Sequence, residues 1–497
     1  MTELPYELPD RIDQLLARAA AAHPQRRAIV TDTGELDYAG LDRRVDSVAA
    51  ALRGLTGAGE VVAVASVLHP DFAVAYYAAA RAGRTVAVVN PLLREEDLLH
   101  VLTLSGATLV VVDEGLQARL AGVRDRLPAL REVVRIGALP EGAGAPADPG
   151  TGPGDTAVLQ FTSGTTGRPK AVRLSHRNVV VNAAQIADAH RVDGDTVALN
   201  HLPTYHPMHL NSAMAAGATQ VLCAAPEPYA ALMTANRHGA TILYSLPVRL
   251  ARLAGDPDLD SISVRTLKRI ASGGSGLPVA AARRLSKRFS LPVFQGYGLA
   301  ETSPLTHSDD PERPVHGSVG RPVAGTECRV VDIDSRAVLP AGGVGEVQLR
   351  GPQVMQGYLG GPDGTGLEPD GWLSTGDVGR VDEDGRLFLV DRLKDVFKCD
   401  NFLVAPSDVE RVLLRQPGVT DAVVVELPDV AHGAVAGALV VLDDPSALRD
   451  VIAAVNDELP YYQHIRDAMT LEAVPRSGNG KIQRRLLAEQ LKSHQPA

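Results

Sequence analysis

The chain has 497 residues, 45% of them hydrophobic and 22% charged, which is enough to bury the cores of two or more globular domains. Its 49 basic and 59 acidic residues give a formal charge of -10, so there is no basic field for nucleic acid or anionic lipid. Any anionic ligand therefore has to be held by local groups.

Cysteine usage and the N-terminal sequence exclude further classes. Cys223, Cys328 and Cys399 are too widely separated for a disulfide framework or for a metal site with CxxC spacing. The start, "MTELPYELPDRIDQLL", has no basic-then-apolar signal peptide, and no apolar run approaches the roughly 20 residues of a transmembrane helix. We expect a cytoplasmic protein with neither membrane nor nucleic acid as a partner.

The first third of the chain alternates between helical and strand patterns. Apolar spacings of three and four predict helices at 10–24, 38–55, 72–83 and 94–106, and short apolar runs predict strands at 59–66, 85–90 and 108–114. A Gly/Pro-rich linker follows at 140–155, and a second α/β run, with strands at 219–224 and 241–246, extends over 157–298. This alternation predicts doubly wound α/β subdomains, in which ligands bind at the carboxyl ends of the strands.

After Pro322 the alternation of helices and strands gives way to short strands separated by turns. Short strands with turn signals at 326–332, 345–351 and 377–391 predict a small antiparallel or barrel-like sheet. Helices at 407–416 and 448–459 and strands at 421–427 and 437–442 then predict a compact α+β segment. We expect a large N-terminal domain, residues 1–393, and a small C-terminal domain, residues 394–497.

The stretch "FTSGTTGRPK" is rich in groups that bind phosphate. Two glycines let backbone N–H groups point into one concavity, hydroxyl groups add donors, and a lysine adds a mobile positive charge; the residues are Gly164, Gly167, Thr162, Ser163, Thr165, Thr166 and Lys170. The spacing is not that of Walker A. The stretch predicts a polyphosphate cradle.

Together with "QGYGLAET", "GWLSTGD", "VDRLKD" and "PRSGNGKIQRR", this loop resembles the signature motifs of the adenylate-forming superfamily. That superfamily includes acyl-CoA synthetases, peptide-synthetase adenylation domains and beetle luciferases, and the resemblance covers nearly the whole chain, with acyl-CoA ligases the most similar. It implies an AMP-forming ligase with ATP, Mg²⁺ and CoA as cofactors. A carboxylic acid would react with ATP to give an acyl-adenylate, which CoA would convert to a thioester.

The resemblance also implies roles for individual residues. The loop would hold the β- and γ-phosphates, Glu301 would hold Mg²⁺, Thr302 would bind the α-phosphate and Lys481 would stabilise pyrophosphate release. Lys394 would be the hinge of a mobile C-terminal lid. The adenine and ribose would be bound by Gly273, Gly274, Ser275, Gln295, Gly296, Tyr297, Gly298, Asp377 and Arg392.

On the acid side, "LPTYHPMH" resembles the segment that flanks the acyl carboxylate in this superfamily, and His206 is the candidate residue. The following segment is about one helical turn shorter than in common members. With Ala213, Ala215 and Ala216 it predicts a wide apolar pocket, and therefore a bulky hydrophobic acid rather than acetate.

One segment departs from the family pattern: Asp400 and Asn401 replace glycines that line the thiol channel in other members. Transfer to a phosphopantetheine carrier protein, or specialisation for one half-reaction, therefore stays open beside the complete CoA ligase. A luciferase-like oxygenase and a catalytically inactive nucleotide-binding regulator are the alternatives from other classes.

Overall fold

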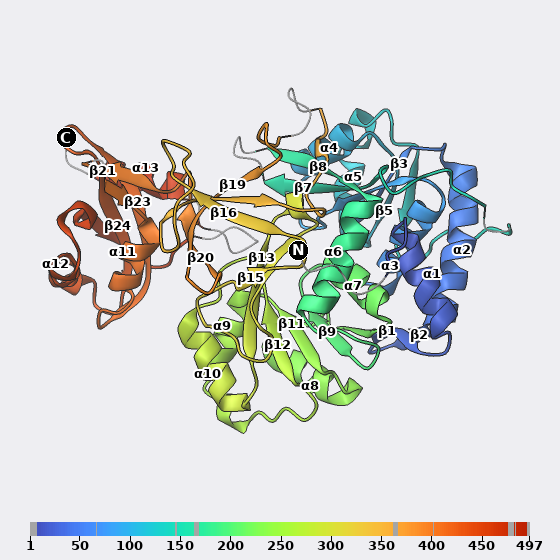
Figure 1. Cartoon of the computed structure of the whole chain (residues 1–497), viewed down its shortest axis with the longest axis horizontal. Coiled ribbons are helices and arrows are strands. Elements are labelled where there is room, and N and C mark those ends of the chain that lie inside the picture. The colour runs from blue at the N-terminus through green and yellow to red at the C-terminus, as the bar shows by residue number, and fades with distance from the viewer. Residues whose placement is uncertain are drawn as a thin grey trace. The chain divides into compact units, whose positions relative to one another are not determined.

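The computed structural model describes residues 7–65, 67–144, 147–163, 168–360, 366–400, 402–475, 482 and 484–494 (Figure 1). The chain divides into two compact units. The first consists of Met1–Cys328 and Leu349–Leu373, and the second of Arg329–Gln348 and Ser374–Ala497. The expected hinge between residues 393 and 394 stays a prediction.

The first unit contains a seven-stranded sheet with the order β18-β8-β7-β4-β3-β5-β6. Its strands are β3 (Val61–Ala65), β4 (Thr85–Val89), β5 (Ala107–Val112), β6 (Glu132–Arg135), β7 (Thr156–Ser163), β8 (Pro169–Ser175) and β18 (Gly357–Tyr358). The strands from β7 to β6 run parallel, whereas β8 and β18 add antiparallel at one edge. Every residue of β5 is buried, as expected for a strand covered on both faces.

A second sheet of the same unit has nine strands in the order β15-β14-β13-β12-β11-β9-β10-β1-β2. They are β1 (Arg27–Thr31), β2 (Gly34–Asp37), β9 (Val197–His201), β10 (Thr219–Leu222), β11 (Ile242–Ser245), β12 (Arg269–Ser272), β13 (Val293–Gly298), β14 (Leu305–Ser308) and β15 (Arg321–Pro322). The central six are parallel, and the three at the edges are antiparallel. The sequence reading missed the β1–β2 hairpin.

Helices connect and cover these sheets. They are α1 (Asp13–Ala22), α2 (Tyr38–Leu55), α3 (Pro70–Arg81), α4 (Glu95–Ser105), α5 (Glu114–Ala121), α6 (His176–Ala189), α7 (Pro207–Ala216), α8 (Pro228–His238), α9 (Pro247–Gly255) and α10 (Val279–Phe289), with short 3₁₀ turns η1 (Arg124–Arg126), η2 (Leu259–Ser261) and η3 (Ala300–Thr302). In Figure 1, α6 and α7 lie between the two sheets, and their buried side chains join the largest hydrophobic core. The expected doubly wound α/β body is therefore confirmed.

The second unit contains two smaller sheets. One has the order β16-β17-β19-β20, formed by β16 (Glu327–Val331), β17 (Gly345–Arg350), β19 (Leu373–Val381) and β20 (Leu387–Arg392). The other joins β21 (Phe397–Cys399), β22 (Phe402–Val404), β23 (Val419–Asp429), β24 (Gly433–Leu442) and β25 (Ile465–Thr470), with helices α11 (Pro406–Leu413), α12 (Leu448–Glu458) and α13 (Arg484–His494) and turns η4 (Pro445–Ala447) and η5 (Tyr461–Gln463). This matches the expected small sheet and α+β segment.

None of the described helices has the length and apolar content needed to cross a bilayer.

Candidate active site

A cavity of about 300 Å³ opens at the carboxyl ends of four parallel strands of the nine-stranded sheet. Its lining comes from the segments that follow β9, β11, β12 and β13, with side chains from β7 and α7 added. Ligands of open α/β sheets bind at this edge, because the loops that leave neighbouring strands converge there. The cavity therefore lies where the sequence predicts the ligand site.

His206 immediately precedes the first residue of α7 and lines this cavity. It is the N-cap residue of the helix, and its Nδ1 accepts the backbone N–H of Met208 at 3.2 Å. Its Nε2 lies 3.2 Å from the side-chain amide nitrogen of Gln160 on β7. Burial lowers the pKa of His206 to about 4, so the imidazole is neutral at physiological pH. Gln160 was not among the predicted residues.

Three flat rings form one wall of the cavity. The ring of His209 packs on that of Tyr244 with centroids 4.2 Å apart, and His190 Nδ1 lies 3.1 Å from the Tyr244 hydroxyl oxygen. Burial lowers the pKa of His190 to about 3 and that of His209 well below its ordinary value, so both are uncharged. Sequence reasoning missed this wall, because its members come from the residue after α6, from α7 and from β11.

The two predicted glycine-rich turns meet at the cavity. Gly273, Gly274, Gly296, Tyr297 and Gly298 all line it, whereas Ser275 is exposed and lies outside the lining. Gly296 and Gly298 allow β13 to pack closely against β14 and the residue before it. A Cβ on Gly298 would lie 1.8 Å from the carbonyl oxygen of Pro304, and one on Gly296 would lie 2.8 Å from Leu305 Cδ1.

Gln295 braces these two turns. Its Oε1 accepts the backbone N–H of Leu277 at 3.0 Å, and its Nε2 donates to the carbonyl oxygen of Ser318 at 2.9 Å. The side chain is buried and both ends are used. Gln295 therefore positions the turn that contains Gly273 and Gly274.

Glu301 and Thr302 lie side by side in η3. The Thr302 hydroxyl is fully buried and lies 2.5 Å from the carbonyl oxygen of Pro304, and it accepts the backbone N–H of Leu299 at 3.0 Å. Glu301 is half-buried, and its Oε1 accepts the hydroxyl proton of Tyr358 at 2.8 Å. A carboxylate that solvent reaches, beside a phosphate-binding candidate, suits a hard cation such as Mg²⁺.

Tyr358 links two predicted elements that are far apart in the sequence. It lies on β18, which pairs with β8 of the phosphate loop, and Lys170 Nζ lies 4.9 Å from the centroid of its ring. Thr162 pairs with Lys170 across the β7–β8 hairpin. Tyr358 therefore connects the loop lysine to Glu301. Residues 164–167, which include Gly164, Thr165, Thr166 and Gly167, lie outside the described residues, as does the side chain of Ser163.

Two predicted ribose contacts lie in the second unit. Asp377 on β19 is opposite Arg392 on β20, and Arg392 Nη1 lies 2.8 Å from Asp377 Oδ1. The Asp377 side chain is 7% exposed, and that of Arg392 is 45% exposed. Lys394 follows in an exposed turn, and Lys481 lies outside the described residues.

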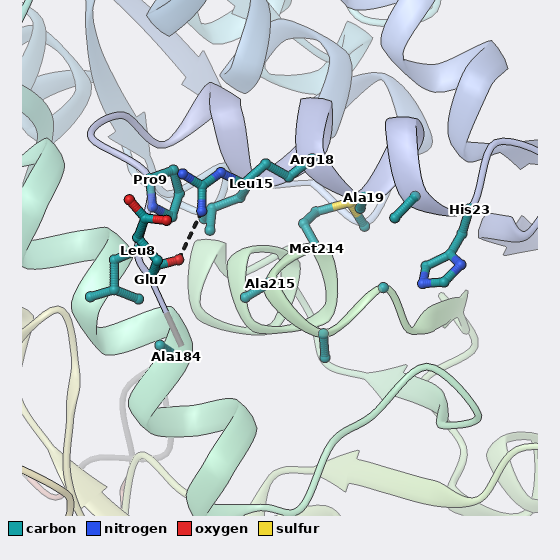
Figure 2. A pocket seen from close by; sticks show the side chains of 13 residues that line it. Glu7, Leu8, Pro9, Leu15, Arg18, Ala19, His23, Ala184, Met214 and Ala215 are labelled. Atoms are coloured by element: carbon teal, nitrogen blue, oxygen red, sulfur yellow. Dashed lines mark hydrogen bonds between the residues drawn. The ribbon is translucent and has the colours of Figure 1, made fainter. Parts of the chain in front are cut away.

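The alanines predicted to widen the acid pocket do not line it. Ala213 is buried in the main core, and Ala215 and Ala216 line a different cavity of about 230 Å³ between α7 and the N-terminal segment (Figure 2). In that cavity Arg18 donates to the carbonyl oxygen of Glu7 at 2.8 Å. The prediction was wrong because a helix rises about 1.5 Å per residue, which moves these alanines more than a turn away from His206.

The fold and the site together define an adenylate-forming ligase. The family model of the AMP-binding enzymes matches residues 16–359, and that of the AMP-binding enzyme C-terminal domain matches residues 408–481. The chain therefore belongs to the AMP-binding enzyme family, and it is an ATP-dependent, AMP-forming acid–thiol ligase that acts through an acyl-adenylate.

Curated relatives and solved structures agree with this assignment. The chain is 31% identical to 4-coumarate–CoA ligase 5 of Oryza sativa subsp. japonica, over 99% of this chain and 96% of the relative. It is 31% identical to 4-coumarate–CoA ligase CCL1 of Humulus lupulus, over 93% and 90% of the two chains. The ATP-bound structure of MatB from Rhodopseudomonas palustris superposes with a TM-score of 0.87 at 28% identity, covering 97% of this chain and 99% of that one.

Proposed function

We propose that the chain is a CoA ligase for a planar, hydrophobic carboxylic acid. The observation that carries this proposal is the cavity at the strand ends, which the rings of His209 and Tyr244, inclined by 43° to one another, line with uncharged aromatic faces near His206. Flat aromatic faces bind planar ligands by stacking. The acid named for the curated relatives, 4-coumarate, is consistent with this shape.

The size of the cavity refines the expectation of a bulky substrate. Its volume of about 300 Å³ lies at the lower end of the range of about 300 to 1,000 Å³ for small-molecule sites. An acid with one or two rings suits this space better than a large polycyclic acid.

The first half-reaction is a displacement at phosphorus. A carboxylate oxygen of the acid forms a bond to the α-phosphorus of ATP, and the bond to the pyrophosphate oxygen breaks. His206, whose Nδ1 accepts the backbone N–H of Met208, presents a neutral ring beside the carboxylate. It therefore forms no ion pair that would hold the carboxylate away from ATP. Glu301 would hold Mg²⁺, which when bound neutralises charge on the phosphates.

In the second half-reaction the CoA thiolate attacks the acyl carbon, the thioester forms and AMP leaves with the bonding electron pair. We assign the phosphates to the Thr162–Lys170 loop, the α-phosphate to Thr302 and the ribose to Asp377 and Arg392. Lys481 would stabilise the first displacement. A phosphopantetheine carrier protein as acceptor is the second candidate, since Asp400 and Asn401 alter the segment expected to handle the thiol.

Acid-dependent pyrophosphate release, measured across acids from acetate to polycyclic acids with and without CoA, tests the proposal. We expect release with one- and two-ring aromatic acids that continues to a thioester when CoA is present. Activity confined to acids of four carbons or fewer, or pyrophosphate release that no CoA converts to thioester, would contradict it.

A pair of variants isolates the aromatic wall. His209→Ala removes the ring and is expected to raise the KM for an aromatic acid several-fold while the KM for ATP stays unchanged. His209→Phe keeps a flat ring and is expected to restore the KM of the native protein. Equal effects of both variants on the acid KM would show that the ring does not contact the acid.

A further inference from the structure

A cluster of metal-binding side chains lies in the second unit, outside the site described above. It begins at the β21–β22 hairpin, where Cys399 pairs with Phe402 and leaves a two-residue turn. Such turns need left-handed backbone conformations, and Asp400 has a φ of +51°. Aspartate tolerates this region better than most residues, which explains how it stands where the family has glycine. Asn401 lies outside the described residues.

His432 meets this hairpin from the connection between β23 and β24. Its carbonyl oxygen accepts the backbone N–H of Asp400 at 3.0 Å, and Gly433 pairs with Cys399. The Asp400 carboxylate oxygens lie 3.0 and 3.1 Å from His432 Nδ1. Asp429 Oδ1 accepts the backbone N–H of His432 at 2.8 Å, which fixes the connection.

One ligand atom each from Cys399, Asp400 and His432 therefore lies within 4.8 Å of the other two. Among the described residues, no other group of three cysteine, histidine or acidic side chains comes as close together. Ligands at about 2.0 to 2.3 Å from a tetrahedral Zn²⁺ are separated by about 3.3 to 3.6 Å. On binding an ion, the three atoms, which lie within 4.8 Å of one another, would have to move to these separations.

We propose that Cys399 Sγ, the Asp400 carboxylate and His432 Nδ1 form a site for a zinc-like divalent transition metal. Sulfur, imidazole nitrogen and carboxylate oxygen together are the donor set that such ions prefer, and Mg²⁺ or Ca²⁺ would want oxygen alone. The thiolate and the carboxylate balance the two positive charges of the ion. Three protein ligands leave a fourth position for water or another ligand.

The site is accessible to an ion. The side chains of His432 and Asp400 are 37% and 33% exposed, so an ion reaches them from solvent, while Cys399 is buried behind them.

A bound metal would tie the β21–β22 hairpin to the turn between β23 and β24. The three ligands come from two segments of chain that otherwise meet through the pairing of Cys399 with Gly433 and the contacts between Asp400 and His432. An ion shared by both segments should stabilise the second unit against unfolding.

Cobalt binding to the full-length protein, freed of purification tags and of metal, tests the proposal. We expect one Co²⁺ per chain with a thiolate-to-cobalt charge-transfer band, which Zn²⁺ displaces. His432→Gln changes a half-exposed side chain and should weaken binding at least about tenfold, and Cys399→Ser should abolish the band. Cys328→Ser and Cys223→Ser should leave it intact.

Two further ligand variants keep the test decisive if Cys399→Ser fails to fold normally. If Cys399→Ser disturbs the core, which its thermal unfolding without metal reveals, His432→Gln and Asp400→Asn still decide the question. A band that survives in Cys399→Ser, affinity unchanged in His432→Gln, or no band in the native protein would overturn the proposal. None of these outcomes depends on ligase activity, so the test stands apart from that of the proposed function.

Discussion

Acid should unfold the first unit well before its carboxylates titrate, because it buries several neutral histidines. Four of them are at most 3% exposed, namely His176, His190, His201 and His307. Burial lowers their pKa values to about 4, 3, 4 and 3. In the unfolded chain a histidine has a pKa of about 6.5. The stability that these groups contribute is complete above that value and is lost as the pH falls toward about 4.

The size of the effect follows from these pKa shifts. Below about pH 6.5, each buried histidine loses about 1.4 kcal/mol of stability for every pH unit, since the unfolded chain binds one more proton. Between about pH 7.5 and about pH 5.5 the four together lose about 5 kcal/mol. This is comparable to the whole stability of many domains, at about 5 to 15 kcal/mol.

Urea unfolding followed by tryptophan fluorescence measures this loss in the right part of the molecule. The chain has one tryptophan, Trp372, which is buried and belongs to the first unit. His176→Gln keeps an acceptor for the Ile12 N–H that Nδ1 now binds at 3.3 Å, and should reduce the acid-induced loss by about 1.3 kcal/mol, the share of one histidine. The exposed His23→Gln provides the control. An unfolding free energy that does not change between the two pH values, or equal pH dependence in both variants, would refute the reasoning.

Three further predictions concern the site. Gly298→Ala, whose new Cβ would lie 1.8 Å from a backbone carbonyl oxygen, should destabilise the first unit by about 3 kcal/mol, and an unchanged thermal transition would contradict this. Tyr358→Phe removes the hydroxyl group that donates a hydrogen bond to Glu301. The Mg²⁺ concentration for half-maximal pyrophosphate release should rise about tenfold, and an unchanged Mg²⁺ titration would contradict this. Asp377→Asn breaks the ion pair with Arg392 and should raise the KM for ATP at least about tenfold with the acid KM unchanged; kinetics in which both constants move together would count against a ribose contact.

Most of the fold was predictable from hydrophobic periodicity. The helix predicted at 38–55 is α2, Tyr38–Leu55, and the buried strands of the first sheet lie within one or two residues of their predicted bounds. The β1–β2 hairpin was missed because β2, Gly34–Asp37, is short, and two of its four residues are exposed, so it lacks an alternating apolar pattern.

The site was predictable where its residues share a local motif, and not where tertiary pairing assembles it. Gly296, Tyr297 and Gly298 lie on one short predicted stretch and line the cavity, whereas the roles of Glu301 and Thr302 stay predictions. Tyr358 is 57 residues from Glu301 and reaches it only because β18 pairs with β8. No local pattern marks such a residue.

The order in which the two units use the chain has a consequence for synthesis and proteolysis. The chain enters the second unit at Arg329, returns to the first at Leu349 and leaves it again after Leu373. On the ribosome, residues 329–348 must wait for partners that are translated later, while the first unit stays incomplete until residue 373 has emerged. A single protease cut near Lys394 would leave pieces of the second unit on both fragments, so neither fragment would carry that unit whole.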